Sequence, residues 1–204
     1  MRKILFIICW ALAGVGLYSC SLDEPSYGKT TSDNYYQKES DIEQALTGAY
    51  LQLRTTWNEY ALNHYFVGDC STDDALKGGG NDGDRAEVRD LSDFTIYTTN
   101  GEVGRRWEIL YRLINRCNDV IYYAPDAIGN EELLKRYANE AKALRAFGYY
   151  CLVTTFGEVP LITTPMQPAE ILQIPRSPLE KVYECIVNDL TAVSYTHLRA
   201  HETG

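Results

Sequence analysis

The chain has 204 residues, of which 45% are hydrophobic and 23% charged, and its formal net charge at pH 7 is −9. An acidic chain repels the phosphate backbone of nucleic acids, which argues against DNA or RNA binding and favours neutral or basic partners. Tyrosine is frequent, with 16 copies against 5 Phe and 3 Trp. Tyr rings pack in half-buried helix seams and also stack on sugars, and helix packing accounts for most of them.

The first 19 residues have the order of features of a secretory signal peptide. A basic start, Met1–Lys3, precedes an uncharged apolar run over 4–17. That run is shorter than the roughly 20 residues needed to span a bilayer, so we expect residues 1–19 to be cleaved after export.

Cys20 follows Leu-x-Ser, which is the bacterial lipoprotein pattern. Acyl chains attached there would anchor the protein, because each buried methylene contributes about 0.8 kcal/mol. The sequence thus predicts a lipid-anchored protein whose polar residues 20–39 form a lipidated tether. The alternative is an ordinary signal peptide, with Cys20 in a disulfide.

A helical domain is expected over residues 40–193. Ser40 and Glu43 match a capping box, followed by apolar residues at helical spacing through Leu53. The stretch 55–102 is expected to be mostly irregular, since Gly78–Gly80 excludes a continuous helix and the run 68–84 is acidic and rich in glycine.

Three further helices are predicted towards the C-terminus. They cover Arg105–Tyr123, Glu131–Phe156 with Asn130 as cap and Gly157 as stop, and a segment from a capping box at Ser177 to about Val193. No segment has strand periodicity, so we expect an all-α fold of tetratricopeptide-like helical pairs with long irregular loops.

The cysteines after Cys20 give no metal-binding pattern. Cys70, Cys117, Cys151 and Cys185 are widely spaced, without a Cys-x-x-Cys pair or a histidine cluster, so neither a zinc site nor a cofactor is expected. Export permits disulfides, whose connectivity stays open. Cys117 and Cys151 lie on apolar helical faces and are expected to be buried thiols.

Catalytic motifs are not found, although the acidic run leaves two alternatives. Its carboxylates could serve a glycosidase, for which the candidates are Asp69, Asp73, Asp74, Asp82 and Asp84. Asp82–Asp84 also resembles the start of an EF-hand loop, but Ala86 occupies the next ligand position. A solvated acidic loop is the favoured interpretation.

Three segments together resemble one family. They are 107–121, 140–163 and 176–190, and the middle one is similar to the Glu-Ala-x-x-Leu-Arg-Ala…Gly-x-Val-Pro-Leu signature of SusD/RagB-like outer-membrane nutrient-binding lipoproteins. The resemblance implies capture of oligosaccharide at the cell surface without catalysis. It also implies a SusC-like TonB-dependent transporter as partner, over which the protein sits as a lid, with the helical pairs as scaffold.

The signature residues are expected to pack helices, with Ala141, Leu144, Ala146 and Gly148 allowing close approach and Arg145 pairing with Asp119 or Glu140. Members of the family are usually more than twice this long. The segment 194–204 fits no expected continuation and is predicted to be a non-native tail after an incomplete SusD-like domain.

Ligand contacts are assigned from residue chemistry alone. Trp57, Tyr60 and Tyr65 are predicted as stacking platforms, with Asn58 and Asp73 as hydrogen-bonding groups. Two other functions remain open: a tetratricopeptide-like scaffold that binds only protein, and a glycoside hydrolase that uses the acidic run.

Overall fold

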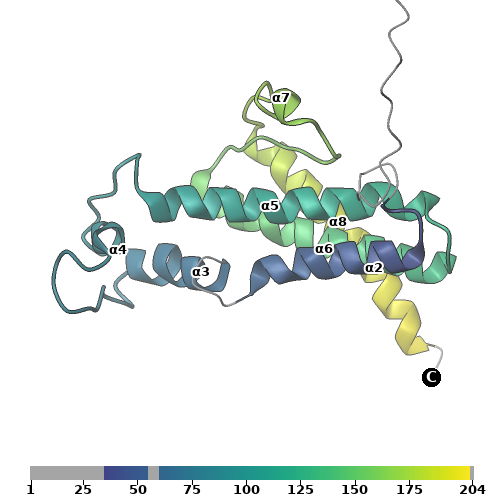
Figure 1. The fold of residues 1–204 in the computed structure, drawn as a ribbon, viewed down its shortest axis with the longest axis horizontal. Helices are drawn as coiled ribbons and strands as arrows, with labels where there is room; N and C mark the ends of the chain where they lie inside the picture. The colour runs from purple at the N-terminus through teal and green to yellow at the C-terminus, as the bar shows by residue number, and fades with distance from the viewer. Residues whose placement is uncertain (1–34, 55–59, 203–204) are drawn as a thin grey trace, which may run out of the picture. The chain divides into compact units, whose positions relative to one another are not determined.

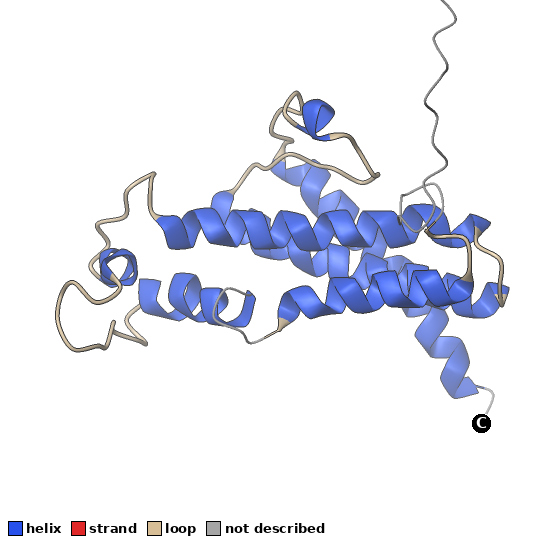
Figure 2. Cartoon of the chain, in the orientation of Figure 1, coloured by secondary structure: helices blue, strands red, loops and turns tan. Residues whose placement is uncertain are grey.

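The computed structural model describes residues 35–54 and 60–202, and in this part of the chain every regular element is a helix (Figure 2). This confirms the predicted all-α class. The α-helices are α2 (Glu39–Tyr50), α3 (Tyr60–Gly68), α4 (Ala86–Ser92), α5 (Gly101–Tyr123), α6 (Glu131–Phe156), α7 (Pro168–Ile171) and α8 (Leu179–Glu202), with 3-10 turns η1 (Leu51–Leu53), η2 (Asp69–Ser71) and η3 (Ala124–Asp126). No helix among these is long and apolar enough to cross a membrane.

Helices α5 and α6 form an antiparallel pair that organises the fold. Arg106 near the start of α5 donates from Nε to Thr155 Oγ1 near the end of α6, at 3.0 Å. Helix α8 packs on α6, whereas α2 and α3 follow one another along α5 (Figure 1). Every long helix therefore buries one face against this pair.

The caps of α5 and α6 explain where these helices begin and end. Asn130 caps α6 as predicted, its side chain accepting from the backbone of Glu132, and Gly157 ends the helix with a φ of 72°. Helix α5 starts four residues before the predicted Arg105, because the Asn100 side chain accepts from the backbone of Glu102 and Val103.

The predicted capping box at Ser40 and Glu43 is wrong. Helix α2 begins at Glu39 with Lys38 as the N-cap residue, and Asp41 Oδ2 accepts the Lys38 backbone N–H at 3.0 Å. Asp41 therefore accepts from the Lys38 N–H in the way that Glu43 was expected to accept from the Ser40 N–H. The predicted apolar face is confirmed, with Ile42, Leu46 and Ala49 buried.

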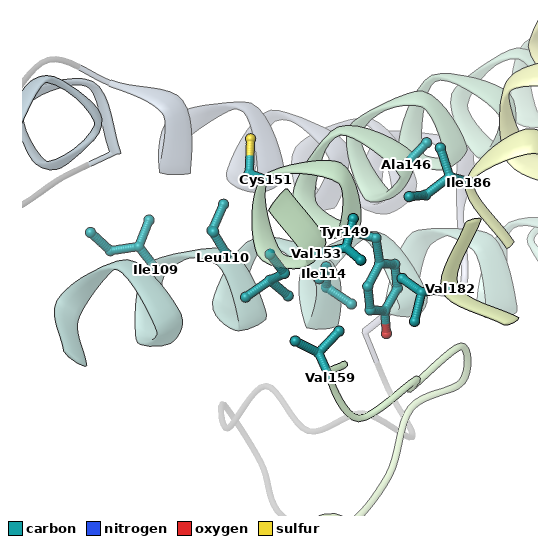
Figure 3. Close-up of a cluster of buried hydrophobic side chains, with 11 residues drawn as sticks. Ile109, Leu110, Ile114, Ala146, Tyr149, Cys151, Val153, Val159, Val182 and Ile186 are labelled. Carbon is teal, nitrogen blue, oxygen red and sulfur yellow. The ribbon is translucent and has the colours of Figure 1, made fainter. Parts of the chain in front are cut away.

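The main core runs along both sides of α6 in two clusters. One joins α5, α6 and α8 around Tyr149, and Figure 3 shows the side chains of this cluster. The other joins α2, α5 and α6 around Ile42 and Ala141. The predicted close approach of helices at the signature residues is confirmed at Gly148. A Cβ there would lie only 3.0 Å from Ile114 Cγ1 on α5.

Arg145 does not pair with Asp119 or Glu140 as predicted. It forms a bidentate pair with Asp189 of α8, with both N···O distances 2.8 Å and both side chains under 10% exposed. Its Nη1 also donates to Asn118 Oδ1 and to the Thr163 carbonyl, each at 2.9 Å. One guanidinium therefore joins α5, α6, α8 and the segment after α6.

Side chains hold the segment that follows Gly157. Tyr111 donates to the Pro160 carbonyl at 2.7 Å, and Asn118 Nδ2 donates to that of Ile162 at 2.9 Å. The Tyr149 hydroxyl donates to the Ile162 carbonyl at 2.7 Å and accepts from the Ile162 N–H at 2.6 Å. The residues 160–162 that follow the Gly-x-Val turn are thereby fixed onto the helices.

No disulfide joins the cysteines of the described residues, and Cys117 and Cys151 are buried as predicted. Burial raises the pKa of Cys117 to about 12, and it also raises the pKa of the half-buried Cys185. Because only the thiolate is alkylated readily, we expect iodoacetamide at pH 8 to modify Cys185 well before Cys117. Mass-spectrometric peptide mapping over time measures both rates, and equal rates in the folded protein would contradict this burial.

Part of the apolar surface of α8 is exposed to solvent. Val182 and Ile186 are buried, but Tyr183 and Leu190 are 43% and 50% exposed. The helix continues to Glu202, and whether residues 194–204 are native stays a prediction. The predicted signal peptide 1–19, the Cys20 lipid site and most of the tether lie outside the described residues.

Candidate functional site

A small separate core supports the region between α2 and α5. Phe66, Cys70, Val88 and Leu91 are buried together, joining α3, η2 and α4. The expectation of a mostly irregular stretch over 55–102 is therefore wrong in part, since it contains two short helices. The loop 72–85 connects η2 to α4 within this small unit.

Hydrogen bonds attach α4 to the start of α5. Asn100 Nδ2 donates to the Glu87 carbonyl at 2.9 Å, and Glu87 Oε1 accepts from the Gly101 N–H at 2.9 Å. From α3, the buried Asn63 donates to the Glu102 carbonyl at 2.8 Å. The ends of these three helices thus form a fixed frame for the loop 72–85.

The loop 72–85 folds back over α4 without forming a helix, as its glycines predict. Gly79 has a φ of 115°, a conformation that glycine adopts readily. Asn81 Oδ1 accepts from the Gly83 and Asp84 N–H groups, which makes an Asx turn. The Lys77 N–H donates to Ser92 Oγ at 3.1 Å and ties the loop to α4.

Two hollows of about 420 Å³ each lie on this loop and share residues 76–79. We call them the Tyr65 hollow and the Asp93 hollow. The first is lined by Tyr65, Phe66, Cys70, Leu76, Lys77, Gly78, Gly79, Asp84, Arg85 and Val88, the second by Leu76, Lys77, Gly78, Gly79, Asn81, Asp82, Arg89, Ser92 and Asp93. One hollow has an aromatic wall and the other is mostly polar, a combination that suits a sugar ring.

Phe94, directly after the lining residue Asp93, has an unfavourable backbone conformation. Its φ is 55°, although it is a bulky residue. The Thr95 N–H donates to the Asp90 carbonyl at 2.9 Å and the Phe94 N–H to that of Leu91 at 3.2 Å. This is a Schellman motif, with Phe94 at the position that glycine usually occupies.

Burial of the Phe94 ring does not offset this strain, because most of the residue is exposed to solvent. Its side chain is 69% exposed, and that of Tyr97 in the same loop is 66% exposed. Backbone strain without a packing benefit is typical of functional positions. We refer to the two hollows together with Phe94 and Tyr97 as the loop site.

The structure brings one predicted contact residue, Tyr65, into the loop site. Tyr65 lines its hollow and is 44% exposed, and Asp73 is exposed in the adjoining loop. Trp57 and Asn58 lie outside the described residues, and Tyr60 is described only as the first residue of α3. These assignments stay predictions.

Sequence reasoning missed Phe94 and Tyr97. Their only sequence signal is that three large apolar residues, Phe94, Ile96 and Tyr97, fall in a segment without helical periodicity. All three are exposed. In the described part of the chain, no group of three or more His, Cys, Asp or Glu side chains could hold a metal ion, despite the acidic run.

The family profile for SusD-like proteins described as "Starch-binding associating with outer membrane" matches residues 21–196. The chain belongs to the SusD-like family. A curated relative, SusD-like protein P2 of Formosa agariphila, is 30% identical over 193 residues, covering 92% of this chain and 36% of the relative. SusD-like protein P25 of the same organism is 26% identical over 200 residues, covering 92% and 37%.

Solved structures agree with this family assignment. A laminarin-binding SusD-like protein superposes with a TM-score of 0.72 at 31% identity, covering 79% of this chain and 34% of that one. The surface glycan-binding protein A of Bacteroides fluxus gives 0.66 at 29% identity, covering 77% and 33%. This SusD-like chain thus spans about a third of the length of these relatives.

Proposed function

We propose that this SusD-like chain is part of a surface lipoprotein that captures oligosaccharide and delivers it to a SusC-like TonB-dependent transporter. The family relationship supports the ligand class, since relatives are named for glycan or laminarin binding. The observation that carries the proposal in this chain is the strained, exposed Phe94, which directly follows Asp93 in the lining of one hollow. A lipid on Cys20 would hold this site at the outer membrane, without catalysis.

Replacing Phe94 by glycine separates ligand binding from stability. Glycine relieves left-handed strain of about 1–2 kcal/mol, and its greater freedom in the unfolded chain offsets about 0.5–1 kcal/mol of this. We therefore expect Phe94→Gly to unfold at the same or slightly higher urea concentration. Loss of the stacking ring should nevertheless weaken binding of laminarin or starch about tenfold, equivalent to about 1.4 kcal/mol.

Affinity electrophoresis against laminarin and starch measures binding, and urea unfolding measures stability. Tyr150→Ala is the control, because Tyr150 is a 53% exposed ring on α6, away from the loop site. Unchanged binding by Phe94→Gly alongside a wild-type protein that binds would overturn the role of the ring. A reducing-sugar assay in the same samples tests the glycosidase alternative, which predicts released product.

A protein-binding scaffold remains the second candidate. It is favoured by an apolar stripe on α8, whose exposed members are Leu179, Tyr183, Val187 and Leu190. Transporter binding with no affinity for glycan would support this scaffold role. Glycan affinity that is lost with Phe94 would support the receptor.

A further inference from the structure

The charges around the loop site are unequal in number. Residues 69–93 contain eight acidic and three basic side chains. The acidic ones are Asp69, Asp73, Asp74, Asp82, Asp84, Glu87, Asp90 and Asp93, and the basic ones are Lys77, Arg85 and Arg89. The charges available to a ligand are those that are not already paired with other groups of the protein.

The two basic side chains of the Asp93 hollow are engaged within the protein. Lys77 Nζ donates to the Asn81 carbonyl at 2.6 Å. Arg89 donates from Nη2 to Asp90 Oδ1 at 2.8 Å and from Nη1 to the Asp82 carbonyl at 3.0 Å. An anionic group in this hollow would therefore compete with the Asn81 carbonyl for Lys77 and with the Asp90 carboxylate for Arg89.

The third cation, Arg85 in the Tyr65 hollow, is engaged in the same way. Its Nη1 lies 3.3 Å from Glu102 Oε1, and its guanidinium carbon lies 4.6 Å from the centre of the Phe66 ring. The exposed side chains of Asp82 and Asp93 line the other hollow. Carboxylates accept hydrogen bonds from sugar hydroxyls but repel sulfate and uronate groups.

We infer that the loop site takes uncharged glycans and discriminates against sulfated or uronic-acid glycans. This inference rests on the proposed glycan binding and adds a ligand class to it. The loop site offers acceptors for hydroxyl groups and apolar rings for stacking. Each cationic side chain that lines the two hollows already has a hydrogen bond or ion pair within the protein.

Matched glycans that differ only in charge test this inference on the full chain. The pairs are laminarin with sulfated laminarin, and starch with carboxymethyl starch. Calorimetric titration at 10 mM and 150 mM salt should show the neutral member binding at least tenfold more tightly at low salt. Added salt should leave neutral binding unchanged and improve anionic binding, because the Debye length falls from about 30 Å to about 8 Å.

The outcomes separate this inference from the proposed function. Tighter binding of the anionic members, weakened by salt, would overturn the charge preference while supporting glycan binding. No binding by any of the four glycans would overturn both.

A variant that lacks two carboxylates of the loop site tests whether this site causes the preference for neutral glycans. Asp82→Asn with Asp93→Asn should narrow the ratio of neutral to anionic affinity about tenfold. The control, Asp126→Asn with Glu180→Gln, removes the same charge from η3 and α8 and should leave the ratio unchanged. Equal effects of both variants would show that net charge, rather than the loop site, selects the ligand.

Discussion

Replacing Asp189 by alanine is expected to destabilise the folded chain by about 3–5 kcal/mol, since it leaves the Arg145 charge buried without its partner. Both side chains are under 10% exposed, and Arg145 keeps only neutral acceptors, Asn118 and the Thr163 carbonyl. Arg145→Lys should also be costly, because an ammonium group cannot reproduce the bidentate geometry. Urea unfolding followed by circular dichroism gives the free energies.

A surface ion pair on α6 provides the matched control. Arg136 and Glu140 lie 3.4 Å apart, but their side chains are 57% and 31% exposed. Arg136→Ala should therefore cost less than about 1 kcal/mol. Similar losses for Asp189→Ala and Arg136→Ala would mean that the Arg145–Asp189 pair does not hold α8 to α6 as the structure shows.

Truncating Tyr149 to alanine is expected to cost about 3–5 kcal/mol, because its ring is fully buried where α5, α6 and α8 meet. Tyr149→Phe isolates the hydroxyl. Burial raises the pKa of this phenol, so the group stays protonated and donates to the Ile162 carbonyl while accepting from its N–H. Losing those bonds should cost about 1–3 kcal/mol.

The adjacent residue is the natural comparison, since Tyr150 is 53% exposed on the same helix. Tyr150→Ala should change the free energy of unfolding by no more than about 0.5 kcal/mol. If Tyr149→Phe unfolds at the same urea concentration as the wild type, the two bonds to Ile162 contribute nothing to stability.

The long helices could be predicted from the sequence because their signals are local. Asn130 and Gly157 mark the two ends of α6 correctly, and its apolar residues repeat with helical spacing between them. Helix α4 has only seven residues and follows a glycine-rich run. It depends on distant contacts such as that of Asn100 with Glu87, so the sequence gives no local signal for it.

The partner of Arg145 and the loop site depend on the same kind of distant contact. Asp189 lies 44 residues from Arg145, and the nearer Glu140 was an equally reasonable partner until the packing of α8 was known. Phe94 is an ordinary aromatic residue in the sequence. Only its positive φ and its exposure distinguish it, and both are properties of the folded chain.

The division of the buried residues into clusters has a consequence for how this protein can change. The four-residue core of α3, η2 and α4 is separate from the two clusters that line α6. Regions with few buried contacts open at low free energy without unfolding the rest of the protein. We therefore expect substitutions in the loop 72–85 to leave the helical scaffold folded, so that the sequence of this loop can diverge among homologues faster than the fold that presents it.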